Sequence, residues 1–189
     1  MYRRKELSEM SLEELWELFP IIITPHRSEW EKWAEDEIRI ITNMLSVFSP
    51  TVTHIGSTAI PRIPAKPIID ILVEISDNND FITVKRIMES NGYICMSVSE
   101  RRMSFNKGYT PDGFAEKVYH VHIRTAGDND EIYFRDYLRE HPEAAHQYGL
   151  LKQSLLPKYK HDRDGYTEAK SEFVRKITEI AKRANGNTL

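Results

Sequence analysis

The chain has a single cysteine, Cys95, among its 189 residues, so an internal disulfide and a cysteine-based zinc site are both excluded. It also lacks a long apolar run. The longest such stretch, Phe19–Ile23, falls far short of the roughly 20 residues that span a bilayer, so we expect no membrane anchor. Acidic residues follow Lys5 where a signal peptide would need an apolar core, so we do not expect secretion. These absences predict a cytoplasmic globular protein.

An excess of positive charge is missing as well. The 26 basic and 29 acidic residues give a net charge of −3, so we expect no general attraction to nucleic acid. The length suits one domain. We predict a single domain over residues 1–189, made of an N-terminal helix and connector (1–27), an α/β core (28–125) and C-terminal helices (126–189).

Helix signals come first along the chain. Ser11 and Glu14 have the spacing of a capping box, and apolar residues follow at helical spacing up to Pro20. A second capping box, Ser28 to Glu31, is expected to open a longer helix. Its apolar residues recur at steps of mostly three and four through Phe48, which predicts one apolar face.

After residue 50 the pattern changes to short β-rich segments. The segment 67–75 is nearly all apolar, so we predict a central strand that is buried on both faces. From Asp130 onward we expect helices, punctuated by Pro142, Pro157 and Gly165. This order predicts an α/β (α+β) fold with a mixed β-sheet flanked by helices. The remaining expected elements are strands over 51–55, 93–98, 101–107 and 117–124 and a helix over 79–91.

The most informative segment runs from His54 to Glu74 and combines a glycine–serine pair with an acid in an apolar strand. Gly56 permits a backbone to approach a phosphate closely, and the Ser57 hydroxyl can bind phosphate oxygens. Asp70 lies in the predicted buried strand, where a carboxylate is costly unless it is paired, hydrogen-bonded or bound to a metal. We therefore expect Asp70 to be a ligand or a base beside a phosphate site.

Two histidines stand two residues apart in the predicted strand 117–124. Residues at this spacing share a face of a strand, so His120 and His122 would lie about 6.6 Å apart. If this strand neighbours Asp70, the three side chains would form a set that suits Mn²⁺, Fe²⁺ or Zn²⁺. General acid–base catalysis, phosphate binding when protonated, and a purely structural role in the sheet remain open alternatives.

The motif and several later segments resemble the GrpB family of nucleotidyltransferase-like proteins. The shared pieces include His54-Ile-Gly-Ser-Thr, Ala65-Lys-Pro-Ile-Ile-Asp-Ile, His120-Val-His and Tyr148-Gly-Leu-Leu-Lys152. The resemblance implies a nucleotidyltransferase-like fold and metal-dependent transfer of a nucleotidyl group from a nucleoside triphosphate to a small acceptor.

The resemblance also implies roles for particular residues. Asp70 and His122 would be catalytic, and Asp70, His120 and His122 would hold a divalent metal, Mg²⁺ or Mn²⁺ in the first place and Zn²⁺ or Fe²⁺ otherwise. Candidate phosphate and nucleotide contacts are Gly56, Ser57, Thr58, Lys66, Arg102, Lys107 and Lys152. By charge alone, Arg124 and Lys170 are further anion-binding candidates, although most such residues are solvated surface groups.

One position departs from the superfamily pattern, which has a second acid two residues after the first. Leu72 stands there, and Glu74 is about 13 Å from Asp70 along a strand, too far to share one ion. Two alternatives therefore stand beside nucleotidyl transfer. One is a non-catalytic module that binds a nucleotide or another phosphorylated metabolite, and the other is a different metal-dependent phosphate enzyme that uses Asp70 with the histidine pair.

Overall fold

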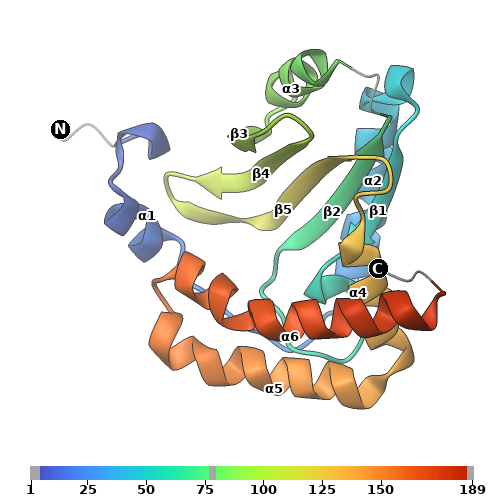
Figure 1. Cartoon of the computed structure of the whole chain (residues 1–189). Helices are drawn as coiled ribbons and strands as arrows, with labels where there is room; N and C mark the ends of the chain where they lie inside the picture. Colours follow the sequence, from blue (N-terminus) through green and yellow to red (C-terminus); the bar gives the residue numbers. More distant parts are fainter. Residues whose placement is uncertain (1–4, 77–79, 187–189) are drawn as a thin grey trace.

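The computed structural model describes residues 5–76 and 80–186 and confirms the predicted mixed sheet flanked by helices (Figure 1). The sheet has the strand order β1-β2-β5-β4-β3. Its strands are β1 (Thr51–Ile55), β2 (Ile69–Ile75), β3 (Ile94–Val98), β4 (Arg102–Thr110) and β5 (Gly113–Thr125). The α-helices are α1 (Leu12–Leu18), α2 (Glu29–Met44), α3 (Phe81–Ser90), α4 (Asp130–Glu140), α5 (Pro142–Tyr159) and α6 (Arg163–Ala184).

The central strands β2 and β5 run parallel, and the other neighbouring strands pair antiparallel. Asp70 pairs in register with His120, and Leu72 pairs with His122. Side chains of directly paired residues lie on the same face of a sheet. The pairing therefore brings the acid and both histidines to one face.

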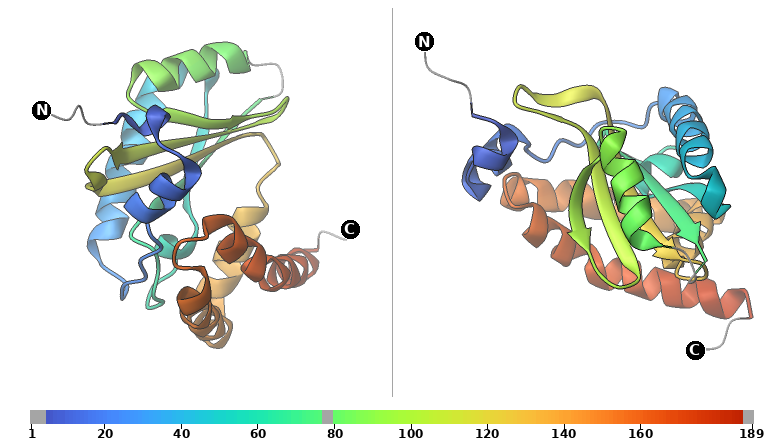
Figure 2. Two further views of the ribbon diagram at one scale, coloured as in Figure 1. Left: turned by 90° about the vertical axis from the view of Figure 1, so that its left-hand side faces the viewer. Right: turned by 90° about the horizontal axis from the view of Figure 1, so that it is seen from above.

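The opposite face carries the main apolar core. Alternate residues of β2 and β5 pack there against α2 and α3, and these helices lie on the side of the sheet away from α5 and α6 (Figure 2). The most deeply buried members include Trp30, Ile41, Ile71, Met88 and Phe105. A second core joins Ile60 and Ile63 of the loop before β2 to α4, α5 and α6. This second core holds the C-terminal helices over the face that bears Asp70.

The helix starts confirm the first capping box and correct the second. Ser11 caps α1 and exchanges hydrogen bonds with Glu14. Ser28 has helical backbone angles and makes no side-chain capping bond, so it does not act as a cap. Pro157 lies inside α5 rather than at a break. Among the residues that the structure describes, no helix is both long and apolar enough to cross a membrane.

Candidate functional site

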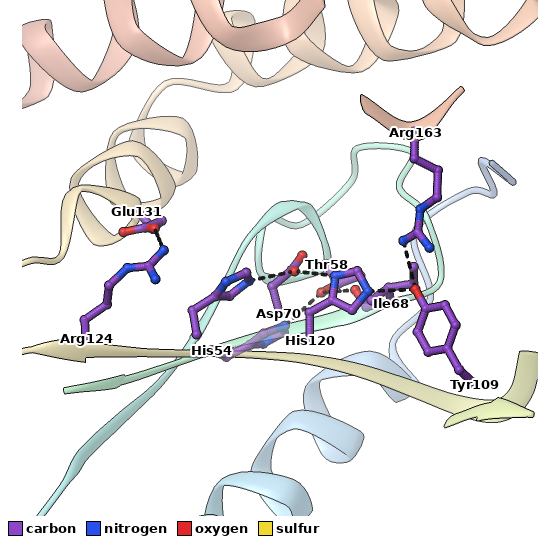
Figure 3. A network of polar contacts seen from close by, with 10 residues as sticks. His54, Thr58, Ile68, Asp70, Tyr109, His120, Arg124, Glu131 and Arg163 are labelled. Carbon is purple, nitrogen blue, oxygen red and sulfur yellow. Dashed lines mark hydrogen bonds and ion pairs between the residues drawn. The ribbon is translucent and has the colours of Figure 1, made fainter. Parts of the chain in front are cut away.

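Asp70 lies between the two histidines of β5. Its Oδ1 atom is 3.5 Å from Nδ1 of His120 and 3.4 Å from Nε2 of His122. Figure 3 shows His120 between Asp70 and Tyr109, in a chain of polar contacts that continues to Arg163. The convergence follows from the parallel register, because β5 presents both imidazoles on the face that bears Asp70. The expected proximity of these three side chains is thus confirmed.

A chain of hydrogen bonds fixes the orientation of His120. Its Nε2 atom lies 2.8 Å from the Tyr109 hydroxyl, which accepts a hydrogen bond of 2.8 Å from Nη2 of Arg163. The Tyr109 proton therefore points to Nε2, and the ring carries its own proton on Nδ1, facing Asp70. Burial lowers the pKa of His120 despite the opposing effect of Asp70, which favours the neutral imidazole.

The same contacts determine the charge of Asp70. Burial alone would raise the pKa of this carboxyl, but the hydrogen bonds from His120 and His122 outweigh it. The pKa of Asp70 therefore lies well below its usual range. Asp70 carries a full negative charge at neutral pH.

The glycine–serine turn packs directly against this carboxylate. Gly56 has φ of 73°, and a Cβ atom at this position would overlap the Asp70 side chain. Only glycine permits such a close approach at this backbone angle. Thr58 is buried, lies 2.9 Å from Nε2 of His54 and donates to the carbonyl of Ile68, so its hydroxyl orders the loop. Thr58 is not among the residues that line the cavity described next.

A cavity of about 130 Å³ lies between this turn and the C-terminal helices. Its walls come from the turn, the loop before β2, strands β2 and β5, and all three C-terminal helices. The lining residues are Gly56, Ser57, Lys66, Ile68, Asp70, His120, Phe134, Tyr148, Lys152, Tyr166 and Lys170. The structure therefore brings together Gly56, Ser57, Lys66, Asp70, His120 and Lys152 of the predicted set.

Three lysines surround the cavity, and each lies near an aromatic ring. Lys152 is 2% exposed, and its Nζ atom donates to the carbonyl of Pro64 at 2.5 Å and lies 4.6 Å from the Tyr148 ring centre. Lys170 lies 4.5 Å and Lys66 5.8 Å from the ring centre of Tyr166. Such placement over aromatic rings stabilises a buried cation in part.

Burial and mutual repulsion make these ammonium groups easier to deprotonate. Burial, with the charges of Lys170 and Lys66, lowers the pKa of Lys152 to about 7. Burial, with the charges of Lys170 and Arg163, lowers the pKa of Lys66 to about 8. The pKa of Lys170 is lowered by burial too. Asp70 is the one carboxylate among the described lining residues, so the lysines of the lining outnumber its acidic residues.

Two predicted phosphate contacts lie elsewhere. Arg102, at the start of β4, forms a two-bond ion pair with Asp128 at 2.7 Å, away from the cavity. Lys107 projects toward α2, where its Nζ atom lies 2.6 Å from the buried carboxylate of Glu37. Each of these two cations is thus paired with a carboxylate that does not line the cavity.

Within residues 5–76 and 80–186, no second acid takes the place of the missing one. Leu72 is fully buried, and Glu74 accepts hydrogen bonds from the Gly127 amide at 2.9 Å and from Asn129 at 3.1 Å. Glu74 thus ties the end of β2 to the turn before α4, instead of standing as a solvated strand end.

The described residues contain no group of three His, Cys, Asp or Glu side chains placed to hold a metal ion. His120 is bonded through both ring nitrogens, to Tyr109 and to Asp70. As they stand, these side chains do not fit a three-ligand metal centre. Metal binding by Asp70, His120 and His122 stays a prediction.

Several residues at or beside the cavity were not among the predicted site residues. Tyr109 and Arg163 complete the chain of contacts to His120, and Phe134 and Tyr148 form the aromatic wall. Their roles depend on how helices far along the chain pack on the sheet, and no local spacing indicates that. Lys170 was a candidate by charge, and the structure places it in the cavity wall.

The family model described as GrpB protein matches residues 20–180. The chain belongs to the GrpB family. Within this family, a UPF0157 protein of Pseudomonas aeruginosa is 34% identical over 160 residues, which cover 83% of this chain and 66% of that protein. The UPF0157 protein YqkA of Bacillus subtilis is 34% identical over 162 residues, covering 81% of this chain and 46% of YqkA. The chain thus spans about two thirds and about half of these two relatives.

A solved structure from the same family has a similar fold. The crystal structure of the conserved protein GrpB from Enterococcus faecalis matches with a TM-score of 0.73 and 31% identity, over 87% of this chain and 99% of that one. A weaker likeness of fold, with a TM-score of 0.48 and 11% identity, is to the Cid1 poly(U) polymerase in its MgGTP-bound structure. It covers 78% of this chain and 46% of Cid1.

Proposed function

We propose that the lysine-lined cavity binds the phosphate groups of a nucleotide-type small molecule. The observation that carries this proposal is the charge of the cavity: Lys66, Lys152 and Lys170 surround it, and Asp70 is the one carboxylate among its described lining residues. Buried charges are costly unless they are paired. A phosphorylated ligand would supply the missing negative charge.

The shape of the site supports a phosphate rather than a simple carboxylate. Gly56 leaves the backbone of the turn open to close approach, and the hydroxyl of Ser57 lines the cavity beside it. The three ammonium groups come from three separate segments, so they can reach a multiply charged group from different sides. Tyr148, Tyr166 and Phe134 provide flat apolar surface for the rest of the ligand.

The lysines also predict how binding responds to pH. The pKa of Lys152 is lowered to about 7, so this group is partly neutral in the free protein near neutral pH. A bound anion favours the protonated form and raises that pKa. Ligand binding should therefore take up protons, and affinity should rise as the pH falls from 8 toward 6.

Nucleotidyl transfer to a small acceptor is the second candidate. It is favoured by the position of Asp70, whose Oδ1 atom lies within 3.5 Å of a nitrogen of both His120 and His122. In that case Asp70 and His122 would be the catalytic pair, and turnover would require an added divalent metal. Another phosphate reaction that uses the same three side chains would have the same requirement.

A thermal-shift and calorimetric screen tests both candidates. The protein would be titrated with ATP, GTP, CTP, UTP and coenzyme A precursors, each with Mg²⁺, Mn²⁺, Zn²⁺ or no metal. A ligand at 100 times Kd stabilises the native state by about 2.7 kcal/mol, which such an assay detects. Lys170→Gln should weaken binding at least tenfold, whereas Lys176→Gln, an exposed lysine on the same helix, should not.

The outcomes separate the candidates. Binding without metal that survives Asp70→Asn supports a binding module. Metal-dependent binding with release of pyrophosphate, lost in Asp70→Asn and in His122→Ala, supports transfer. If no phosphorylated compound shifts the melting temperature, or if Lys170→Gln binds like Lys176→Gln, the proposed cavity function is wrong.

A further inference from the structure

A second and larger hollow lies on the other side of the loop that precedes β2. It is a groove of about 750 Å³ between the extended segment 23–26, the loop 61–64 and helices α4 and α5. This volume falls within the range of about 300–1,000 Å³ that small-molecule sites occupy. Pro64 lines the groove, and its carbonyl accepts the hydrogen bond from Lys152, so the groove and the lysine cavity share a wall.

The groove is basic although the chain as a whole is acidic. Its described lining includes Arg62, Arg139, His26 and His146 but no Asp or Glu. A carboxylate outside the lining also acts on the groove, because the negative charge of Glu31 favours the protonated forms of His26 and Arg139. The remaining walls are largely proline, isoleucine, leucine and alanine side chains. A lining of this kind suits a ligand that has an anionic group and an apolar body.

Buried polar atoms in the groove wall lack partners. Oγ1 of Thr24 and Nδ1 of His26 are inaccessible to solvent and make no hydrogen bond within the described part of the chain. Most buried polar groups in proteins are hydrogen-bonded, so two such atoms within the segment 23–26 call for an explanation. A polar ligand group held against this wall would satisfy them after a small adjustment of the segment.

The backbone conformation at Arg62 also supports a ligand site in the groove. Arg62 has φ of 69°, a conformation that glycine adopts freely and arginine rarely does. Its side chain is exposed and forms no ion pair with any residue in the described ranges. Non-glycine residues held in this region cluster at ligand-binding sites. The strained backbone at Arg62 therefore places an exposed guanidinium beside the groove.

From these four observations we infer that the groove is a second ligand site, which takes a small organic anion with an apolar body. Arg62 and His146 would contact the anionic group, which is a carboxylate or a phosphate, and the isoleucine and proline side chains would contact the body. This inference does not depend on the proposed function of the lysine cavity, because none of the groove's described lining residues lines that cavity.

The test uses phenyl phosphate and benzoate as anionic probes and benzyl alcohol as the neutral counterpart. We expect the anions to shift the backbone amide resonances of Arg62, Ile63 and His146 and to bind at least tenfold more tightly than the alcohol. The ratio of the dissociation constants of phenyl phosphate and benzoate identifies which charged group the site prefers.

Two variants keep folding and binding apart. Arg62→Gly should lower the affinity for the anionic probes at least fivefold. It should also raise the melting temperature, because glycine accepts the positive φ. His146→Gln should lower this affinity without a change in melting temperature, and Arg86→Gln, an exposed arginine on α3, should change neither. Equal affinity of Arg62→Gly and the wild type for the anions would overturn the inference. Loss of probe binding in Lys170→Gln would place the probes in the lysine cavity and overturn the inference as well.

Discussion

Replacing Gly56 by alanine would place a methyl group against the side chain of Asp70. At Gly56 the backbone has φ of 73° and ψ of −171°, a region that is essentially reserved for glycine. The new Cβ atom would overlap the carboxylate and lie 2.9 Å from Cβ of Asp70, closer than such atoms approach in real structures. The substitution therefore strains the backbone and displaces the acid at the same time.

The magnitude follows from these two contributions. Residues held in such backbone regions cost about 1–3 kcal/mol. Relieving the overlap requires Asp70 to leave its position, which breaks hydrogen bonds to a charged group worth about 1.5–3 kcal/mol. Because part of each cost is avoided by relaxation, we expect Gly56→Ala to lower the free energy of unfolding by about 3 kcal/mol. For a chain of this size that lowers the melting temperature by about 6–12 °C.

Gly92 provides a matched control for the backbone contribution. It also has a positive φ, 83°, but a Cβ atom there would have no neighbour within 4 Å. Gly92→Ala should therefore cost only about 1 kcal/mol. Both variants would be compared with the wild type by urea unfolding and by calorimetry. If Gly56→Ala proved no less stable than Gly92→Ala, the close approach of the turn to Asp70 would be refuted.

Three further predictions concern buried polar groups. The pKa of Lys152 is about 7 in the folded protein and 10.5 in the unfolded chain, so between these values the unfolded chain holds the extra proton. The free energy of unfolding should therefore rise with pH across this window. The slope should be shallower in Lys152→Met. Urea unfolding at pH 7, 8 and 9 measures that slope. Tyr109→Phe removes the hydroxyl between Arg163 and His120, and should cost about 1–2 kcal/mol and change the His120 tautomer seen by ¹⁵N NMR. Glu37→Gln should lower the free energy of unfolding by about 2–3 kcal/mol, because it leaves the ammonium of Lys107 without its charge partner. Chemical denaturation measures this loss, and Lys85→Gln, which breaks the exposed Lys85–Glu89 pair on α3, is the control.

The sheet was predictable because its signals are local. The apolar run before Ile75 and the alternation before Thr125 were sufficient to place β2 and β5. The glycine–serine turn and the buried position of Asp70 were predictable for a similar reason: glycine, serine and an acid in an apolar strand each limit what the backbone can do. The parallel pairing that places His120 beside Asp70 could not be predicted, since the spacing of residues along the chain does not encode strand order.

The cationic half of the site was harder to predict. Lysine and arginine are common surface residues, and nothing near Arg102 in the sequence reveals its partner Asp128, which lies in the turn after β5. Likewise, Lys170 enters the cavity only because α6 packs over the sheet. The direction of a long, flexible side chain is set by tertiary contacts, and these bring Lys66 and Lys152 to the cavity and Arg102 to Asp128.

The register of β2 against β5 links the core of the molecule to its chemistry. Ile71 and Val121 are paired residues that are fully buried on the core face, while Asp70 and His120 are the pair immediately before them on the other face. A slip of one residue would turn every side chain of the strand to the opposite face. The fit of apolar side chains around Ile71 therefore sets the geometry of the acid and the imidazoles. Substitutions around Ile71 should therefore shift Asp70 relative to His120, although they touch neither side chain.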